Sequence, residues 1–295
     1  MKILVVGSLN FDYTFMVKRL PQEGETILAG DFRTAFGGKG ANQAVACSRL
    51  GGEVCIIGAI GNDSIGKDML VNLKNNGVDI SGIRKLEGPS GMAVISVDQN
   101  SENTIVVNPG VNGQLTAEHI DQSEELIKEC DIILTQLEIP MDAVERVVEL
   151  AHKWGKKVIL NPAPAAKIKE DILEKVFLIT PNESELFQLS GKRNINEGVK
   201  KLLETGVEKV VVTLGSRGCI YMDNTICKKY GVSKVNAIDP TAAGDTFNAA
   251  MAVSINKSMD DAVEFASKCA AIATTKIGAQ TSIPFLRDVE NLNDK

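Results

Sequence analysis

The sequence has few histidines, no basic excess and no closely spaced cysteines, and each shortage excludes a class of function. Only two of the 295 residues are histidines, His119 and His152, and neither has other ligand types at a zinc-site spacing. Acidic residues outnumber basic ones by 38 to 32, for a net charge of −6, whereas nucleic-acid binding normally needs a basic excess. We therefore expect no histidine zinc site and no nucleic-acid partner, and an anionic ligand has to be held by local groups.

Long apolar runs and C-x-x-C pairs are also missing. No run reaches the length of a membrane span, and the N-terminal KILVVG is too short for the core of a secretory signal. These features predict a soluble, cytoplasmic protein with no membrane partner. The cysteines lie among apolar neighbours, which predicts buried free thiols in a reducing compartment. They are Cys47, Cys55, Cys130, Cys219, Cys227 and Cys269.

Short apolar runs alternate with segments of helical periodicity along most of the chain. The runs are rich in valine and isoleucine, and we expect buried strands at KILVVG, EVCIIGAIG, DIILTQ, KKVILN, VFLIT and KVVVTLG. Two clear helices are predicted, over residues 63–76 and from Pro140 to Trp154, each with one apolar face, which in the second helix includes Trp154. This alternation predicts a single α/β domain over residues 1–295, with a mainly parallel sheet and helices on both faces.

Two stretches, at about 11–36 and 91–110, break this alternation. They contain the strand-like runs DYTFMV, ETILAGDF, GMAVISVD and TIVVN without intervening helices. The last two runs flank a polar turn at 99–102, which is typical of a hairpin. We therefore predict a small β-sheet at one edge of the main sheet, which serves as a lid, a dimer surface or both.

The segment DPTAAGDTF has the composition of an anion cradle. The small residues Ala242, Ala243 and Gly244 precede a helical run, so their N–H groups can reach a phosphate. Asp245 places a carboxylate beside that site, where it can accept a proton from an attacking hydroxyl. The alternative is that Asp245 only complements the dipole of the helix.

A glycine-rich segment, AFGGKGANQA, opens another helix but does not match a Walker A loop. Gly37, Gly38 and Gly40 let the backbone approach a ligand closely, or simply form a tight turn. Lys39 and Asn42 can bond hydroxyls or phosphate oxygens.

Polar side chains also follow two of the predicted strands, where open α/β sheets bind ligands. Asn10 and Asp12 lie two residues apart in GSLNFD, so they share a face and can bind neighbouring sugar hydroxyls. Glu138 follows DIILTQ at the same edge. Alternatively, these are ordinary polar loop residues.

Two further segments can serve a nucleotide. Asn182 and Glu185 in TPNESE have the spacing of a capping box, and alternatively organise water around phosphate-bound Mg²⁺. The turn TLGSRG, residues 213–218, leaves a strand and can line a nucleotide groove.

Taken together, the ordered segments resemble the ribokinase/phosphofructokinase-B family of carbohydrate kinases. The resemblance covers essentially the whole chain and rests on GSLNFD, AFGGKGANQA, QLEIP, NPAPA, TPNESE, TLGSRG, AAGDTFNAA and GAQTSIP. It implies a ribokinase-like fold with a β-sheet lid. It also implies ATP-dependent phosphorylation of D-ribose at its 5-hydroxyl. The predicted β-sheet lid separately suggests a homodimer through lid–lid contact, because uncovered edges and apolar faces favour pairing.

The resemblance further implies a role for each matching residue. Asp245 would be the base, and the amides of Ala242, Ala243 and Gly244 would form the anion hole. Ribose would be held by Asn10, Asp12, Gly38, Lys39, Asn42, Glu138 and Asp245. The ATP groove would contain Asn182, Thr213, Leu214, Gly215, Ser216, Arg217, Gly218, Gly244, Asp245 and Ser267, with Asn182 and Glu185 linked to Mg²⁺. A K⁺ site would involve Asp239, Thr241, Ala273, Lys276, Gly278 and Ser282, several through backbone carbonyls.

One residue departs from the family pattern, and several rival functions remain. Pro240 stands where the family commonly has threonine, which removes an N–H beside the cation ligands. Rival substrates within the family are deoxyribose, fructose and nucleosides. A non-catalytic sugar or nucleotide sensor would use the same fold, but it need not keep Asp245. A dinucleotide-dependent dehydrogenase would need G-x-G-x-x-G after the first strand, where GSLNFD stands.

Overall fold

A nine-stranded sheet forms the centre of the protein in a computed structural model that describes residues 1–100 and 102–291. The strand order is β13-β12-β11-β10-β9-β8-β1-β4-β5, and pairing is parallel from β11 to β5. The strands are β1 (Lys2–Val6), β4 (Glu53–Ile60), β5 (Asp79–Lys85), β8 (Ile132–Thr135), β9 (Lys157–Leu160), β10 (Leu178–Ile179), β11 (Lys209–Thr213), β12 (Cys219–Met222) and β13 (Cys227–Tyr230). The predicted mainly parallel sheet is confirmed, whereas β5 and the antiparallel β12 and β13 were not foreseen.

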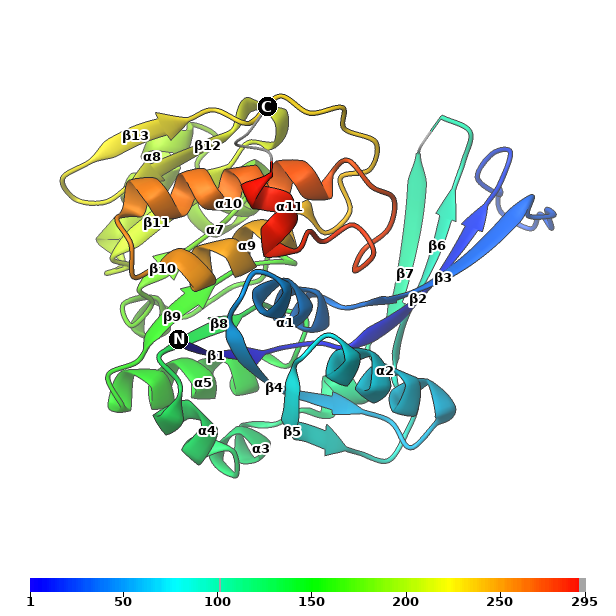
Figure 1. Cartoon of the computed structure of the whole chain (residues 1–295), viewed down its shortest axis with the longest axis horizontal. Helices are drawn as coiled ribbons and strands as arrows, with labels where there is room; N and C mark the ends of the chain where they lie inside the picture. The colour runs from blue at the N-terminus through cyan, green and yellow to red at the C-terminus, as the bar shows by residue number, and fades with distance from the viewer. Residues whose placement is uncertain (101, 292–295) are drawn as a thin grey trace.

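Helices cover both faces of this sheet, because successive side chains of each buried strand point to opposite sides. In β1, Ile3 and Val5 belong to one apolar core, and Leu4 and Val6 to the other. The first core is covered by α1 (Lys39–Arg49), α2 (Ser64–Asn75), α9 (Ala243–Ser254), α10 (Met259–Ala273) and α11 (Leu286–Glu290) (Figure 1). The second is covered mainly by α3 (Ala117–Asp121), α4 (Glu124–Glu129), α5 (Met141–Lys153), α6 (Glu170–Leu173), α7 (Glu183–Ser190) and α8 (Ile195–Glu204).

A second sheet of four strands projects from one end of the main sheet and is called the lid here (Figure 1). Its order is β3-β2-β6-β7, with β2 (Asn10–Met16), β3 (Asp31–Gly37), β6 (Gly91–Val97) and β7 (Asn103–Asn108). The predicted hairpin is confirmed as the antiparallel pair β6–β7, although Ser101 in its turn lies outside the described residues. The run ETILAGDF was wrong as a strand, because residues 25–30 form no ladder and β3 begins only at Asp31.

The two predicted helices are confirmed as α2 and α5, with one correction at a helix end. Asp63 caps α2 by accepting from the Gly66 N–H at 2.8 Å, and Gly77 follows it with a φ of 74°. Trp154 was expected on the buried stripe of α5 but is 39% exposed. It lies just past the helix end, where its indole N–H donates to Glu124 and two lysine ammonium groups lie over its ring.

The cysteines are all free, as predicted, but not all buried. Cys227 is exposed because it begins β13, the edge strand of the main sheet, and Cys55 is half-buried. Cys47, Cys130 and Cys269 lie in the core. Within the described part of the chain, we find no helix with both the length and the apolar character needed to span a bilayer.

Candidate active site

The carboxyl ends of β1 and β8 meet the start of α1, and the Glu138 carboxylate joins them. Ser8 Oγ donates to Glu138 Oε2 at 2.5 Å, and the backbone N–H of Lys39 donates to the same oxygen at 3.0 Å. Close approach at this junction requires glycine, because a Cβ at Gly40 would lie 2.5 Å from the carbonyl carbon of Gly7. Glu138 therefore fixes the first turn of α1 against the sheet edge.

Asp245 lies in the first turn of α9 and faces α1. Its side chain is buried, and each carboxylate oxygen accepts one amide hydrogen bond. Asn42 Nδ2 donates to Oδ2 at 2.9 Å, and Gln43 Nε2 donates to Oδ1 at 3.0 Å. Burial raises the pKa of Asp245, while the nearby Lys39 ammonium and the two amides act to lower it. The group is therefore a fixed carboxylate in a largely dry site, suited to accepting a proton.

Asp12 and Lys39 complete a cluster of charges around Asp245. Burial, followed by repulsion from Glu138 and Asp245, raises the pKa of Asp12 to about 6. Burial acts to lower the pKa of Lys39, but attraction to Asp245, Glu138 and Glu185 outweighs it and raises that pKa. The sequence-predicted residues Asp12, Lys39, Glu138 and Asp245 are thus brought together from four separate elements.

Asn10 reaches the same site and is oriented by Asn112, a residue that the sequence analysis missed. Asn112 Nδ2 donates to Asn10 Oδ1 at 2.9 Å and to the Leu9 carbonyl at 2.9 Å, while Asn112 Oδ1 accepts from the Leu9 N–H at 3.0 Å. Gly38 lies alongside with a φ of 83°, and a Cβ there would lie 2.7 Å from the Asn10 nitrogen. Asn42 Oδ1 is buried and has no hydrogen-bond partner among the described residues.

The start of α9 has the geometry of an anion site. Ala242 precedes the helix with a φ of 60°, which is rare for a residue with a side chain. The Ala243 N–H donates to the Pro240 carbonyl at 3.1 Å, and the Thr246 N–H donates to the Ala242 carbonyl at 2.8 Å. The N–H groups of Ala242, Gly244 and Asp245 have no acceptor within residues 1–100 and 102–291. Of the amides predicted for the anion hole, that of Ala243 is therefore already occupied, while those of Ala242 and Gly244 are free, and the Asp245 N–H is a further free donor.

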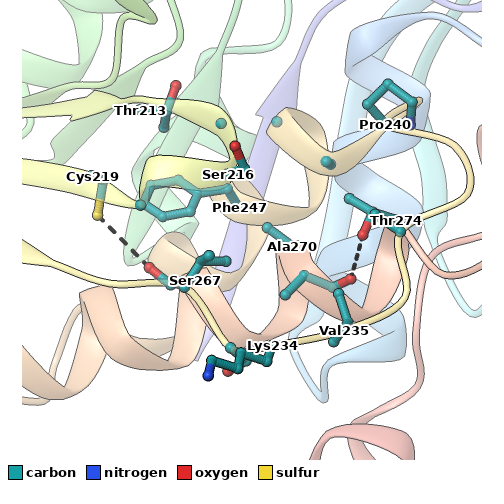
Figure 2. Close-up of a pocket in the computed structure, with 18 of the residues that line it drawn as sticks. Thr213, Ser216, Cys219, Lys234, Val235, Pro240, Phe247, Ser267, Ala270 and Thr274 are labelled. Carbon is teal, nitrogen blue, oxygen red and sulfur yellow. Dashed lines mark hydrogen bonds between the residues drawn. The ribbon is translucent and has the colours of Figure 1, made fainter.

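A cavity of about 560 Å³ lies against the start of α9, with Gly244 among its lining residues (Figure 2). Its walls are mostly apolar, with Phe247, Ala270 and Val235 among the lining residues. Ser267 and Cys219 are joined there by a long hydrogen bond of 3.7 Å (Figure 2). Six predicted nucleotide residues line the cavity, namely Thr213, Gly215, Ser216, Gly218, Gly244 and Ser267. Val232 to Val235, Ala237 and Ile238 also line the cavity and were not predicted, because this part of the loop has no periodicity or motif. Asp239 and Pro240, which the sequence analysis assigned to or beside the cation site, belong to the same wall.

Five predicted nucleotide residues lie outside the cavity wall, namely Asn182, Glu185, Leu214, Arg217 and Asp245. Asn182 and Glu185 form the expected capping box of α7, with bonds of 2.8 and 2.9 Å. Asn182 also bridges to Thr213, which does line the cavity. The Leu214 side chain is buried in the second core, and Arg217 is paired with Glu183. Burial raises the pKa of Glu185, against an opposing pull from Lys39 and the Asn182 N–H.

The residues predicted for a K⁺ site also converge, although their side chains bond mostly to one another. Asp239 Oδ1 accepts from the Thr241 N–H at 2.9 Å, and Asp239 Oδ2 accepts from the Gly278 N–H at 2.9 Å. Ser282 Oγ lies 3.5 Å from the Thr241 carbonyl oxygen. The Ala273 carbonyl accepts from the Lys276 N–H at 3.4 Å.

Comparison with known proteins gives consistent relatives over the full chain. The pfkB family of carbohydrate kinases matches residues 1–286. A ribokinase from Schizosaccharomyces pombe is 40% identical over 98% of this chain and 96% of its own. A deoxyribokinase from Salmonella typhi is 34% identical over 100% of this chain and 98% of its own. The solved structure of Arabidopsis thaliana ribokinase complexed with ribose and ATP has 32% identity and a TM-score of 0.92, covering 98% of this chain and 97% of that one.

Proposed function

The chain belongs to the pfkB family of carbohydrate kinases, and from this premise we propose that it phosphorylates D-ribose at its 5-hydroxyl with ATP. The observation that carries the proposal is the position of Asp245. This buried carboxylate stands between a cluster of sugar-binding groups on one side and the nucleotide-sized cavity on the other. The unpaired amides of Ala242, Gly244 and Asp245 lie at the same helix start.

The mechanism follows from these positions. Asn10, Asp12, Asn42 and Glu138 hold the sugar hydroxyls, so that the 5-hydroxyl lies against Asp245. Asp245 accepts the hydroxyl proton as the oxygen attacks the γ-phosphorus, and the bond to the ADP oxygen breaks. The N–H groups of Gly244 and Asp245 stabilise the charge on the transferring phosphoryl oxygens. The lid excludes water, which limits hydrolysis of ATP.

Mg²⁺ fits this site as an ion carried by the nucleotide. Among the described residues there is no group of three or more acidic, histidine or cysteine side chains that could hold a metal alone. Glu185 is the nearby carboxylate outside the sugar cluster, and its electrostatic interaction with Lys39 places it close to the transfer site. Mg²⁺ supplies charge neutralisation on the ATP phosphates, and Glu185 with Asn182 would hold its water.

We propose that K⁺ binds where the 239–241 and 273–282 segments meet. Carbonyl and hydroxyl oxygens of both segments lie close together there, which suits a large monovalent cation. The ligands are Asp239, Thr241, Ala273, Lys276, Gly278 and Ser282, mainly through backbone oxygens. Pro240 removes one N–H from this loop but leaves its carbonyl, which already fixes Ala243. An ion here stabilises the turn that leads into the anion site.

We also propose that the lids form a homodimer and that the protein works in the cytoplasm. The lid exposes large apolar side chains, namely Phe32, Val94, Ile105, Val106 and Val107. A second lid would cover them. Free cysteines and the use of ATP favour a reducing interior. Sedimentation at micromolar concentration should give a dimer, which Ile105→Lys with Val107→Lys should convert to a monomer. A monomeric wild-type protein would exclude this arrangement.

A sugar panel with ATP tests the function directly. ADP release is measured with D-ribose, 2-deoxyribose, fructose and a nucleoside, and the product is identified by phosphorus NMR. We expect ribose to give the highest kcat/KM and a 5-phosphate. A site that bonds a hydroxyl loses that bond with the deoxy sugar, so 2-deoxyribose should be a poorer substrate. Equal or better turnover of 2-deoxyribose would favour the deoxyribokinase reading, and no turnover of any sugar would favour a sensor.

A further inference from the structure

A chain of buried amide side chains lies behind Asp245, and the proposed reaction does not use it. Gln43 donates through Nε2 to Asp245 Oδ1 at 3.0 Å and to Asn161 Oδ1 at 3.2 Å. Gln136 donates through its own Nε2 to Gln43 Oε1 at 2.5 Å. Gln43 and Gln136 are 0% exposed and Asn161 is 7% exposed. Amides from the end of β8 and the end of β9 therefore meet the Gln43 amide of α1, which alone of the three contacts the Asp245 carboxylate.

We infer that Gln43, held in place by Gln136 and Asn161, is a positioning residue that keeps the Asp245 carboxylate ionised and aimed at the sugar hydroxyl. The inference rests on the proposed kinase function, which makes Asp245 the proton acceptor. Gln43 itself has no exposed surface, so it acts through Asp245 and touches no substrate.

The orientation of the Gln43 amide is fixed by its partners. Both Nε2 hydrogens have acceptors, and Oε1 has a donor in Gln136. Rotating the amide by 180° would set Oε1 against the oxygens of Asp245 and Asn161, and would set two NH₂ groups against each other. Only one orientation is consistent with the network, so Gln136 and Asn161 ensure that Gln43 presents a donor to Asp245.

Packing alone does not account for this chain of amides. Gln136 Oε1 is buried and has no partner in the described part of the protein, which costs free energy of folding. The space for it depends on glycine, since a Cβ at Gly7 would collide with that oxygen. An apolar side chain would fill the same volume without an unpaired oxygen. The need to position the Asp245 carboxylate explains why amide side chains occupy this buried place.

Gln43 and Asn42 each donate a hydrogen bond to a different oxygen of the Asp245 carboxylate. Asn42 is 6% exposed and can also contact the sugar, whereas Gln43 is fully buried and cannot. Hydrogen bonds to the ionised form lower the pKa of a carboxyl group, which opposes the rise caused by burial. Without the Gln43 donor, Asp245 would hold its own proton to a higher pH and could rotate about its side-chain bonds.

The test replaces Gln43 by methionine, which has similar length and no donor. We expect kcat to fall about 10- to 100-fold, which corresponds to the loss of one hydrogen bond to a charged group. The acidic limb of the kcat–pH profile should move to higher pH, while the KM for ribose changes little. Ser48→Ala is the matched control, because it removes a hydrogen bond of the same helix, Ser48 Oγ to the Asn76 carbonyl at 2.6 Å, away from Asp245. This control should leave kcat and the pH profile unchanged.

A second readout does not depend on turnover. The Asp245 carboxyl carbon is titrated by carbon-13 NMR in the wild type and in Gln43→Met, with Asp245→Asn to assign the signal. We expect a higher pKa in Gln43→Met. An unmoved titration overturns the inference, even if kcat falls, because a purely structural loss would not move it. A wild type that phosphorylates no sugar refutes the proposed function instead, and the titration still decides the role of Gln43.

If Gln43→Met does not fold, the Gln136→Met variant tests the inference instead. This variant leaves the Gln43 donor in place but frees its amide to rotate. We expect a smaller shift of the acidic limb in the same direction. A profile identical to that of the wild type would overturn the inference.

Discussion

Replacing Asp245 by asparagine removes the proposed proton acceptor with almost no change in volume. A positioned base contributes about 10²–10⁴-fold to turnover, so we expect kcat to fall by that factor. Two amide donors converge on the carboxylate, and an asparagine can accept from only one of them. The unpaired donor costs about 1–3 kcal/mol, offset in part because a buried charge is removed. Ribose binding should persist, since Asn10, Asp12 and Glu138 are untouched.

The assay combines ADP release for kcat, calorimetry for the Kd of ribose, and thermal unfolding for stability. Asp131→Asn serves as the control, because Asp131 is an exposed carboxylate that accepts from the Lys2 N–H at the opposite edge of the sheet. Turnover of Asp245→Asn close to that of the wild type would remove Asp245 from the role of base. Loss of ribose binding in parallel with kcat would show that Asp245 serves mainly to bind the sugar.

Three more predictions concern the surrounding groups. Because Asp12 has a raised pKa of about 6, it gains a proton as pH falls through that value, so the Kd of ribose should rise below pH 6; a Kd independent of pH from 5 to 8 would contradict this. Gly244→Val should fold normally, since a Cβ there meets nothing within 4 Å, but should lower kcat/KM for ATP roughly 10²-fold by displacing phosphate; unchanged ATP kinetics would argue against the anion site. Turnover should rise when K⁺ replaces Na⁺ at constant ionic strength, and equal rates in both salts would count against the cation site.

Much of the fold and of the site could be predicted from the sequence, because both produce patterns among neighbouring residues. Buried parallel strands are continuous apolar runs, and the turns that lead into α1 and α9 are glycine- and alanine-rich. Asn10, Asp12, Lys39 and Glu138 were identified because they follow strands or open helices. Their convergence in the structure follows from the parallel sheet, which brings the carboxyl ends of its strands to one edge.

The missed features depend on partners that are distant in sequence. Asn112 orients Asn10 from 102 residues away, and Gln136 meets Gln43 across 93 residues. The periodicity of a sequence does not indicate such pairs. Gln43, Gln136 and Asn161 nevertheless all lie in segments on which the family resemblance rests. Residues 232–238 lie in no regular element and include no glycine or motif, so their place in the cavity wall had no local signal. Cys227 and Trp154 were wrongly predicted to be buried. Whether a residue is buried depends on where its helix or strand begins and ends relative to the surface.

The lid carries both proposed tasks, sugar binding and self-association. Asn10 and Asp12 lie where β2 leaves β1, while Phe32 lies toward the far end of the same ladder. Of the apolar residues in the proposed dimer surface, Phe32 lies at that far end, whereas Val107 pairs with Ala93, which in turn pairs with Asp12. In the proposed dimer, substitutions at Phe32 would change how copies assemble while the chemistry at the base is preserved, whereas substitutions at Val107 would alter assembly and sugar binding together.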